Sequence, residues 1–369
     1  MKPLRILVVG QTPPPYGGQT VMIQYLLDGI YHDIEFVHVR TNFSKELKSA
    51  GKFAIGKMWE LIRVVFAIYL ARIKKRPQVL YYPPAGPHLI PVLRDIVLLC
   101  ATRWLFNATV FHFHAGGIAR YSERLNPVLR RLFWLAFAKP ELVIRTAGLA
   151  AQDGQGLCCK KKVIIPNGIP DSARTSIRRM SDTGEPIRIL FVALLREDKG
   201  IFVAIDAVRQ LLMMGMNVEL ICIGEWDSPG VQARARLMIE ETFRPRFKFP
   251  GVQIESEKWE FYKNADVFLF PSFFHSETFG LVLVEAMCFS LPIVATRWSG
   301  IPEVVEDGRC AILCESRDAD SCRYALALLA SDSSLRDKMG RKARERYLRY
   351  FTLDLHRRAM KSALSQLRG

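Results

Sequence analysis

The stretch Ala265–Asp307 decides the fold; it reads ADVFLFPSFFHSETFGLVLVEAMCFSLPIVATRWSGIPEVVED. It begins with a short apolar run, Val267–Phe270, which predicts a buried strand. Residues 271–276 are the predicted loop, and a helix is expected to open at Thr278 and to continue to Cys288. A second apolar run, Ile293–Ala295, predicts another strand. A strand, a crossover helix and a second strand form the repeating unit of a parallel sheet.

The same alternation runs outward in both directions along the chain. Apolar runs predict strands over residues 5–9, 35–39, 79–82, 109–114, 142–145 and 163–165, and again over 187–193, 218–223, 247–249, 267–270, 293–295 and 311–314. Amphipathic segments such as 19–30, 201–214 and 231–242 lie between them. Near-continuous apolar strands that alternate with helices are typical of parallel sheets covered on both faces. We therefore predict an α/β protein with two doubly wound, Rossmann-like domains that face each other across a cleft.

The domain boundaries follow from composition. Residues 1–170 form the predicted N-terminal domain. Residues 171–186 are polar and lack periodicity, so they are the predicted linker. Residues 187–340 form the predicted C-terminal domain. The remaining residues, 341–369, are basic and helical in pattern, and we expect one helix that packs back on the N-terminal domain.

Charge is distributed unevenly along the 369 residues. The net charge is +16, and residues 1–180 hold 26 lysine and arginine residues against 10 acids, whereas the rest of the chain holds equal numbers of both. Half of the residues are hydrophobic, which excludes a disordered chain. The basic half indicates an anionic partner, which leaves phosphates, a membrane surface and nucleic acid as alternatives.

Several classes of protein are disfavoured by missing motifs. The chain lacks the glycine pattern of dinucleotide-binding domains and of P-loop nucleotidases. Its eight cysteines are too sparse for a disulfide scaffold and lack the spacing of a zinc site, so buried reduced thiols are expected. The chain has neither a leader-like start nor an apolar run of about 20 residues. These features predict a cytoplasmic protein.

Two acids flank the start of the helix predicted within Ala265–Asp307. Glu277 would precede the free N–H groups near Phe279, Gly280 and Leu281, which favour an anion. Glu285 lies inside an apolar run, where a carboxylate is costly without donors such as sugar or ribose hydroxyls. The alternatives are an N-terminal helix charge for Glu277 and an internal ion pair for Glu285.

Two further candidates lie at strand ends in the first half of the chain. Gly17 and Gly18 follow the first strand and precede a helix, so their backbone can approach a phosphate or another polar group. The alternative for this pair is an ordinary turn. His114 ends the strand predicted over 109–114, at the edge of a parallel sheet where ligands bind. The alternative for His114 is a purely structural histidine.

These residues carry a resemblance to a known family. Glu277-x7-Glu285 and the residues around it resemble the signature of retaining nucleotide-sugar glycosyltransferases of family 4, the group that includes glycogen synthase and sucrose synthase. The other matching segments fall in the family's order along the chain: Gly17-Gly18, His114, Pro166–Ile169, Lys199-Gly200, Phe279-Gly280, Glu285-Ala286-Met287, Pro292 and Gly300–Glu303.

The resemblance implies an enzyme of the GT-B type. Its C-terminal domain would bind a UDP- or GDP-sugar, and its N-terminal domain would bind a lipid-diphosphate-linked or polysaccharide acceptor in cell-surface glycan biosynthesis. Transfer would retain the anomeric configuration and would need neither a metal nor another cofactor. Absence of an Asp-x-Asp motif agrees with this, because positive charge and helix amides would then stabilise the departing phosphate.

The resemblance also implies a role for each site residue. Glu277 would bind donor-sugar hydroxyls and Glu285 the ribose. Lys199 and the amides of Phe279, Gly280 and Leu281 would hold the diphosphate, with His114 near the sugar and the leaving phosphate. The predicted catalytic residues are therefore Glu277, His114 and Lys199, and the predicted donor-binding residues also include Arg196, Gly17 and Gly18.

One departure from the family's pattern concerns the phosphate contact. The family usually carries Gly-Arg where this chain has Ala193-Leu194, so Arg196 is the candidate replacement for the missing arginine. A catalytically inactive, sugar-binding scaffold of the same fold is therefore one alternative function. A nucleic-acid-binding protein is the other, because of the positive charge.

A greasy and basic segment in the N-terminal half bears on the acceptor. Within residues 53–73, apolar side chains including Trp59, Ile62 and Phe66 recur at helical spacing, and basic residues are interleaved with them or follow them. The predicted alternatives are an interfacial helix on an anionic membrane and a helix whose apolar face is simply core. The first would make the protein peripheral at the inner face of the plasma membrane.

Overall fold

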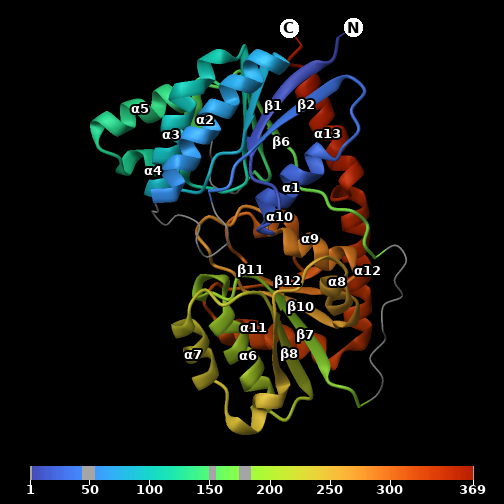
Figure 1. Ribbon diagram of the computed structural model, residues 1–369. Helices are drawn as coiled ribbons and strands as arrows, with labels where there is room; N and C mark the ends of the chain where they lie inside the picture. The colour runs from blue at the N-terminus through green and yellow to red at the C-terminus, as the bar shows by residue number, and fades with distance from the viewer. Residues whose placement is uncertain (1, 44–54, 149–154, 174–183, 369) are drawn as a thin grey trace. The chain divides into compact units, whose positions relative to one another are not determined.

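The computed structural model describes residues 2–43, 55–148, 155–173 and 184–368 (Figure 1). The chain divides into two compact units. Unit 1 comprises Met1–Gly168 together with Leu353–Gly369, and unit 2 comprises Ile169–Thr352. Each unit contains a six-stranded sheet in which every neighbouring pair of strands is parallel. The predicted fold class, two Rossmann-like α/β domains, is confirmed.

The sheet of unit 1 has the strand order β2-β1-β3-β4-β5-β6. Its strands are β1 (Leu4–Gly10), β2 (Ile34–Arg40), β3 (Val79–Tyr82), β4 (Ala108–Phe113), β5 (Leu142–Arg145) and β6 (Lys161–Ile164). One face is covered by α2 (Ile55–Lys75), α3 (Leu89–Thr102) and α5 (Pro127–Phe137), whose inner side chains share a core with the strands. The other face is covered by α1 (Gly18–Leu27) and α13 (Leu353–Ser365). Shorter helical turns are η2 (Arg103–Leu105), α4 (Ile118–Tyr121), η3 (Ser122–Arg124) and η4 (Gln155–Leu157).

The sheet of unit 2 has the order β12-β11-β10-β7-β8-β9. Its strands are β7 (Ile187–Val192), β8 (Val218–Ile223), β9 (Phe247–Gly251), β10 (Val267–Phe270), β11 (Ile293–Thr296) and β12 (Ala311–Cys314). The core on one face includes side chains of α6 (Ile201–Met213) and α11 (Ala319–Ser331). The remaining helices are η5 (Glu197–Lys199), α7 (Pro229–Leu237), η6 (Glu241–Arg246), α8 (Glu255–Asn264), α9 (Leu281–Cys288), α10 (Ile301–Val304) and α12 (Ser333–Tyr350). Every predicted strand is present, with its ends shifted by at most two residues.

The C-terminal segment differs from the prediction of one helix over residues 341–369 that packs on the N-terminal domain. It consists of two helices, and only α13 belongs to unit 1, whereas α12 belongs to unit 2. The break falls at Phe351 and Thr352. Phe351 is buried with its ring edge-on to Phe279, and Thr352 forms a parallel bridge with Ile169. These tertiary contacts draw the two residues out of helical register, which periodicity alone does not reveal.

The boundary region after residue 168 also differs in detail from the predicted linker over 171–186. Residues 174–183 lie outside the described residues. Asp171 is held by a bidentate ion pair with Arg344 of α12, with nitrogen–oxygen distances of 2.6 and 2.7 Å. The first residues of the predicted linker are therefore fastened to unit 2.

Each of the described helices is too short or too polar to cross a membrane. This includes α2, which contains the greasy segment predicted over residues 53–73; residues 53 and 54 lie outside the described residues.

Candidate active site

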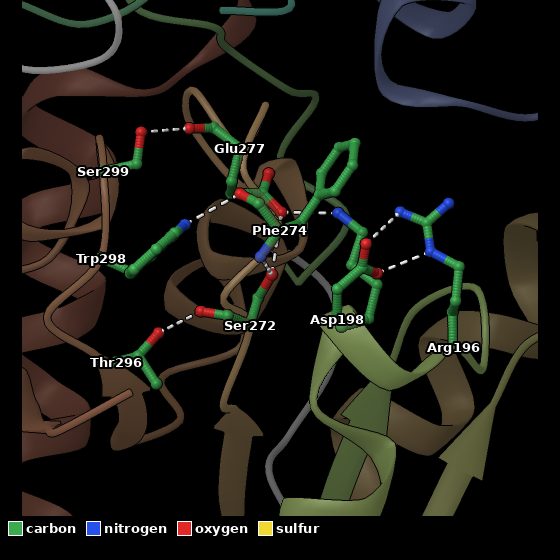
Figure 2. A network of polar contacts seen from close by, with 9 residues as sticks. Arg196, Asp198, Ser272, Phe274, Glu277, Thr296, Trp298 and Ser299 are labelled. Atoms are coloured by element: carbon green, nitrogen blue, oxygen red, sulfur yellow. Dashed lines mark hydrogen bonds and ion pairs between the residues drawn. The ribbon is translucent and has the colours of Figure 1, made fainter. Parts of the chain in front are cut away.

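The loop between β10 and α9, residues 271–280, carries Glu277 at the carboxyl end of the sheet of unit 2. Three hydrogen bonds from Thr296, the last residue of β11, and from the residues that follow it fix the backbone of this loop (Figure 2). The Thr296 hydroxyl donates to the carbonyl of Ser272. The indole N–H of Trp298 donates to the carbonyl of Phe274 at 2.8 Å, and the Ser299 hydroxyl donates to the carbonyl of Glu277 at 2.6 Å. The position of the Glu277 backbone is therefore set by a neighbouring strand end.

The side chain of Glu277 forms an ion pair with Lys199. The Lys199 Nζ lies 2.6 Å from Glu277 Oε2, and the Ser272 hydroxyl donates to the same oxygen at 3.3 Å. Both charged side chains are largely buried. Lys199 Nζ also lies 4.4 Å from the ring centroid of Phe274, in cation–π geometry. Two of the three predicted catalytic residues thus lie in direct contact, although 78 positions separate them in the sequence.

Lys199 reaches this position because the turn between β7 and α6 packs tightly against the β10–α9 loop. Gly200 has a φ of +85°, and a Cβ there would lie 2.2 Å from the carbonyl oxygen of Pro271. Only glycine fits such a close approach in this backbone conformation. The N–H of Phe273 donates to the carbonyl of Asp198 at 2.9 Å, which joins the two loops a second time.

Arg196, the candidate replacement for the arginine missing at Leu194, belongs to the same network. Its guanidinium makes two hydrogen bonds to the Asp198 carboxylate, at 2.6 and 3.0 Å, and stacks 4.7 Å from the Phe274 ring centroid (Figure 2). Arg196 also lines a pocket of about 770 Å³ beside the loop, together with Arg234 and Arg317. Arg196 therefore lies next to Lys199, with part of its donor capacity already used by Asp198.

The predicted start of the helix at Thr278 is wrong by three residues, since α9 begins at Leu281. Gly280 is the N-cap and has a φ of +72°, a left-handed conformation that ends the loop just before the helix. Glu277 therefore lies within the loop, four residues before the first helical residue. The amides of Phe279, Gly280 and Leu281, which were predicted to hold the diphosphate, therefore do not all belong to the start of the helix. Phe279 is buried against Phe351, and only Leu281 belongs to the first turn of α9.

Glu285 lies in a separate network inside α9. Its carboxylate is buried and accepts hydrogen bonds from the Lys258 ammonium and from the Tyr262 hydroxyl, both at 2.7 Å and both from α8. Burial and the adjacent Glu285 carboxylate raise the pKa of Tyr262 well above its usual value, so the phenol stays protonated. The internal ion pair considered as an alternative is therefore present, and binding of a ribose by Glu285 stays a prediction.

The remaining predicted site residues belong to unit 1. His114 directly follows β4, and its ring centroid lies 4.0 Å from that of His112, whose Nδ1 is hydrogen-bonded to the hydroxyl of Tyr81. Burial, reinforced by the nearby His356, lowers the pKa of His114 to about 3. The imidazole of His114 is therefore neutral at physiological pH.

The glycine pair of unit 1 has ordinary backbone geometry. Gly17 is the N-cap of α1 with a φ of −119°, and its N–H donates to the hydroxyl of Thr20 at 3.0 Å. A Cβ at Gly18 would meet no atom within 4 Å. Among the residues that the structure describes, none therefore requires glycine at residue 18, and the contact with a donor stays a prediction.

Several residues of the network were missed by sequence reasoning. Ser272, Trp298 and Ser299 support Glu277 directly or through the loop backbone, and Asp198 holds Arg196. The signal that points to them is position, since each follows the carboxyl end of a strand in one parallel sheet, where ligand sites lie. Across the described ranges, no group of three or more histidine, cysteine or acidic side chains is arranged to hold a metal.

The chain is similar in sequence to known glycosyltransferases. Residues 174–346 match the family described as Glycosyl transferases group 1. A Salmonella typhimurium protein named as a colanic acid biosynthesis glycosyltransferase, WcaL, is 29% identical over 269 residues, which are 70% of this chain and 64% of that protein. The chain thus spans less than two thirds of this relative's length.

Solved structures agree on the fold. The sucrose-phosphate synthase of Thermosynechococcus elongatus superposes with a TM-score of 0.74 at 18% identity, over 98% of each chain. HepE from Anabaena, solved in complex with UDP, superposes with a TM-score of 0.73 at 19% identity, over 99% of this chain and 100% of that one. Residues 174–346, just under half of the chain, are therefore similar to the group 1 glycosyltransferases, and the chain as a whole has the GT-B fold that these solved structures share.

Proposed function

We propose that the protein transfers a hexosyl group from a UDP- or GDP-sugar to a lipid-linked or polysaccharide acceptor in cell-surface glycan synthesis, with retention of configuration and without a metal. The observation that carries the proposal is the contact between Lys199 and Glu277 at the carboxyl end of a parallel sheet. The name of WcaL supports the polysaccharide product, and the UDP complex of HepE supports a nucleotide-sugar donor.

The chemistry assigns a different task to each partner of the ion pair. As the bond between the anomeric carbon and the diphosphate breaks, negative charge grows on the departing phosphate oxygens, and a fixed cation stabilises that charge most where water is excluded. Lys199 supplies the cation, and Arg196 adds a second positive charge beside the same Phe274 ring. The carboxylate of Glu277 accepts hydrogen bonds from donor-sugar hydroxyls and so orients the anomeric carbon.

The acceptor side of the proposal concerns unit 1. We place acceptor binding there, with the neutral imidazole of His114 near the sugar and the leaving phosphate. The acceptor hydroxyl forms the new glycosidic bond as the bond between the anomeric carbon and the diphosphate breaks, and its proton passes to the departing phosphate oxygen. Association with the inner face of the plasma membrane would bring the enzyme to a lipid-linked acceptor, and nucleic acid is not an expected partner.

The test of the proposal is the substitution Glu277→Gln. The variant keeps the size of the side chain and the hydrogen bond from Ser272 but removes the charge that pairs with Lys199. The donor for the assay is the UDP- or GDP-sugar that raises the thermal unfolding temperature most, because a ligand of the folded state stabilises it. We expect donor hydrolysis and transfer to fall by about 10²–10³-fold.

Glu241→Gln is the matched control, since Glu241 is exposed and forms an ion pair with Arg244 of its own turn. This control should keep the full rate, and both variants should unfold at temperatures close to that of the unmodified protein. A rate near normal in Glu277→Gln would remove this residue from the active site.

A further inference from the structure

Helix α2 is apolar on two opposite sides. Its inner side places Val64 and Ile68 in the core of unit 1, where both are fully buried. Its outer side exposes Trp59 to 71% and Phe66 to 63%, and Ile62 lies between them on the same side. The buried inner side fits the predicted alternative of a helix whose apolar face is core. It does not explain the apolar residues on the outer side. A helix that only covers a core carries polar residues on its outer side.

The exposed apolar surface continues onto the neighbouring helices. Helix α3 contacts both α2 and α5, and all three cover the same face of the sheet (Figure 1). Trp104, just beyond α3, is 69% exposed and lies edge-on to Tyr69 of α2. On α5, Val128, Leu132 and Leu135 are exposed at helical spacing. The greasy surface is defined here as Met58, Trp59, Ile62, Phe66, Leu70, Ile73, Val97, Trp104, Val128, Leu132 and Leu135.

Positive charge accompanies this greasy surface. The segments of α2, α3, η2 and α5 contain nine lysine and arginine residues and only two acids. Both acids are already neutralised. Glu60 accepts from Arg63 and from the N–H of Asn42, and Asp95 is buried with hydrogen bonds from Arg94, Tyr82 and the N–H of Ala85. The charge that remains is therefore strongly positive.

We propose that the greasy surface docks on an anionic lipid surface, with Trp59, Ile62 and Phe66 placed among the lipid headgroups. Tryptophan and phenylalanine beside lysine and arginine are typical of helices that lie in the membrane interface. Lys74 and Lys75 are exposed at the end of α2, and Arg130 and Arg131 are exposed on α5, where they can meet lipid phosphates. A protein partner would explain the apolar residues, but the exposed cations favour a surface of phosphates.

This inference rests on the proposed function for its purpose, since a lipid-linked acceptor lies in a membrane, but its test is independent of transfer. The full chain is mixed with vesicles of phosphatidylcholine alone and with vesicles that also contain phosphatidylglycerol, and the bound fraction is measured by flotation. We expect at least tenfold stronger partition onto the anionic vesicles at low salt, and a clear loss at 0.5 M salt.

Variants assign the binding to the named residues. Trp59→Ser combined with Phe66→Ser should weaken partition at least tenfold, and Lys74→Gln combined with Lys75→Gln should weaken it and reduce its salt dependence. Leu237→Ser is the matched control, because Leu237 is 88% exposed at the end of α7 in unit 2. The control should bind vesicles normally.

Thermal stabilisation by the donor is measured on every variant, and it should be unchanged in all of them. If no donor stabilised the unmodified protein, this result would count against the proposed function but not against the docking proposal. Equal partition onto neutral and anionic vesicles, or full binding by the Trp59 and Phe66 double variant, would overturn the docking proposal. So would a dimer in solution that this double variant dissociates, because the surface would then serve a second copy.

Discussion

Glu285 is a buried carboxylate whose two oxygens already have donors from α8, the ammonium of Lys258 and the hydroxyl of Tyr262. A charge in such a place is tolerated only because it is paired and hydrogen-bonded. Removal of one partner leaves the other charge poorly compensated. A change at Glu285 should therefore lower the stability of unit 2 first. Any effect on nucleotide binding would come in addition.

We expect Glu285→Gln to lower the free energy of unfolding of unit 2 by about 2 kcal/mol, because Lys258 loses its counter-charge while Tyr262 keeps an acceptor. Urea denaturation measures the change. Lys258→Met should cost a similar amount, and the double variant should cost less than the sum of the two. Nucleotide affinity, measured separately by calorimetry with UDP and GDP, should fall in Glu285→Gln. An unchanged affinity would contradict the predicted contact with the ribose.

At the scale of elements, the β10–α9 loop depends on the segment that follows β11. Trp298 and Ser299 hold two of its carbonyl groups by hydrogen bonds, and Glu277 owes its backbone position to them. A loop held in this way is preorganised, so its side chains need little rearrangement when a ligand binds.

We expect Trp298→Phe to reduce donor hydrolysis several-fold without unfolding the protein, because it removes the indole N–H that fixes Phe274 and weakens the loop by about 1 kcal/mol. Ser299→Ala should act in the same direction. Trp226→Phe is the matched control, since the Trp226 ring packs on Phe249 of β9. Unchanged hydrolysis in both loop variants would show that these hydrogen bonds do not position Glu277 for the reaction.

The helices and strands also show which features of the fold can be predicted from the sequence. The strands were predictable, because apolar runs such as Val218–Ile223 and Val267–Phe270 depend on burial on both faces of a sheet. The start of α9 was not, because Thr278 resembles a helix cap, whereas the left-handed conformation of Gly280 decides the boundary. The break at Phe351 depends on a contact with Phe279, 72 positions away, which no local pattern encodes.

Sequence reasoning named some charged residues of the candidate site, but neither the residues that support them nor their pairing. Resemblance to a family singled out Lys199, Glu277 and Glu285, since it works position by position. Which of these charges contact each other depends on how the loops pack. Lys199 reaches Glu277 because Gly200 lies against Pro271, whereas Glu285 turns to Lys258 on another helix.

At the scale of the whole molecule, the two units differ in their buried histidines. Unit 1 contains six of the seven histidines, among them His112, His114 and His356, whereas unit 2 contains one, the exposed His275. Burial lowers the pKa of His356 to about 4 and that of His114 to about 3, and it places the pKa of His112 well below its usual value. These imidazoles are neutral in the folded protein and bind protons readily only when unit 1 unfolds.

The sign of the pH effect follows from linkage. A histidine with a lowered pKa contributes its full stability above the unfolded value of about 6.5, and the contribution is lost as the pH falls from there toward the folded pKa. We therefore expect unit 1 to lose stability between about pH 6.5 and 4.5, by up to about 1.4 kcal/mol per pH unit for each histidine. Unit 2 should change much less over this range.

Urea unfolding at a series of pH values measures this difference, with hydrogen exchange used to monitor the unfolding of each unit separately. His356→Gln should make the pH dependence of unit 1 shallower, because glutamine does not titrate in this range. Its amide can still donate to the carbonyl of Pro166, as the imidazole Nδ1 does. A pH dependence of equal steepness in both units would contradict the assignment to these histidines.

Helix α13, which follows unit 2 in the sequence, completes a sheet face that begins with the first strand. Met360 and Leu364 are fully buried in the same cluster as Ile6 and Val8. During translation this face stays open until α13 has left the ribosome, and by then the whole of Ile169–Thr352 has emerged. The unit that is begun first is thus closed only after the second unit has been made, and a stop codon placed before Leu353 would leave the apolar face of the first unit uncovered.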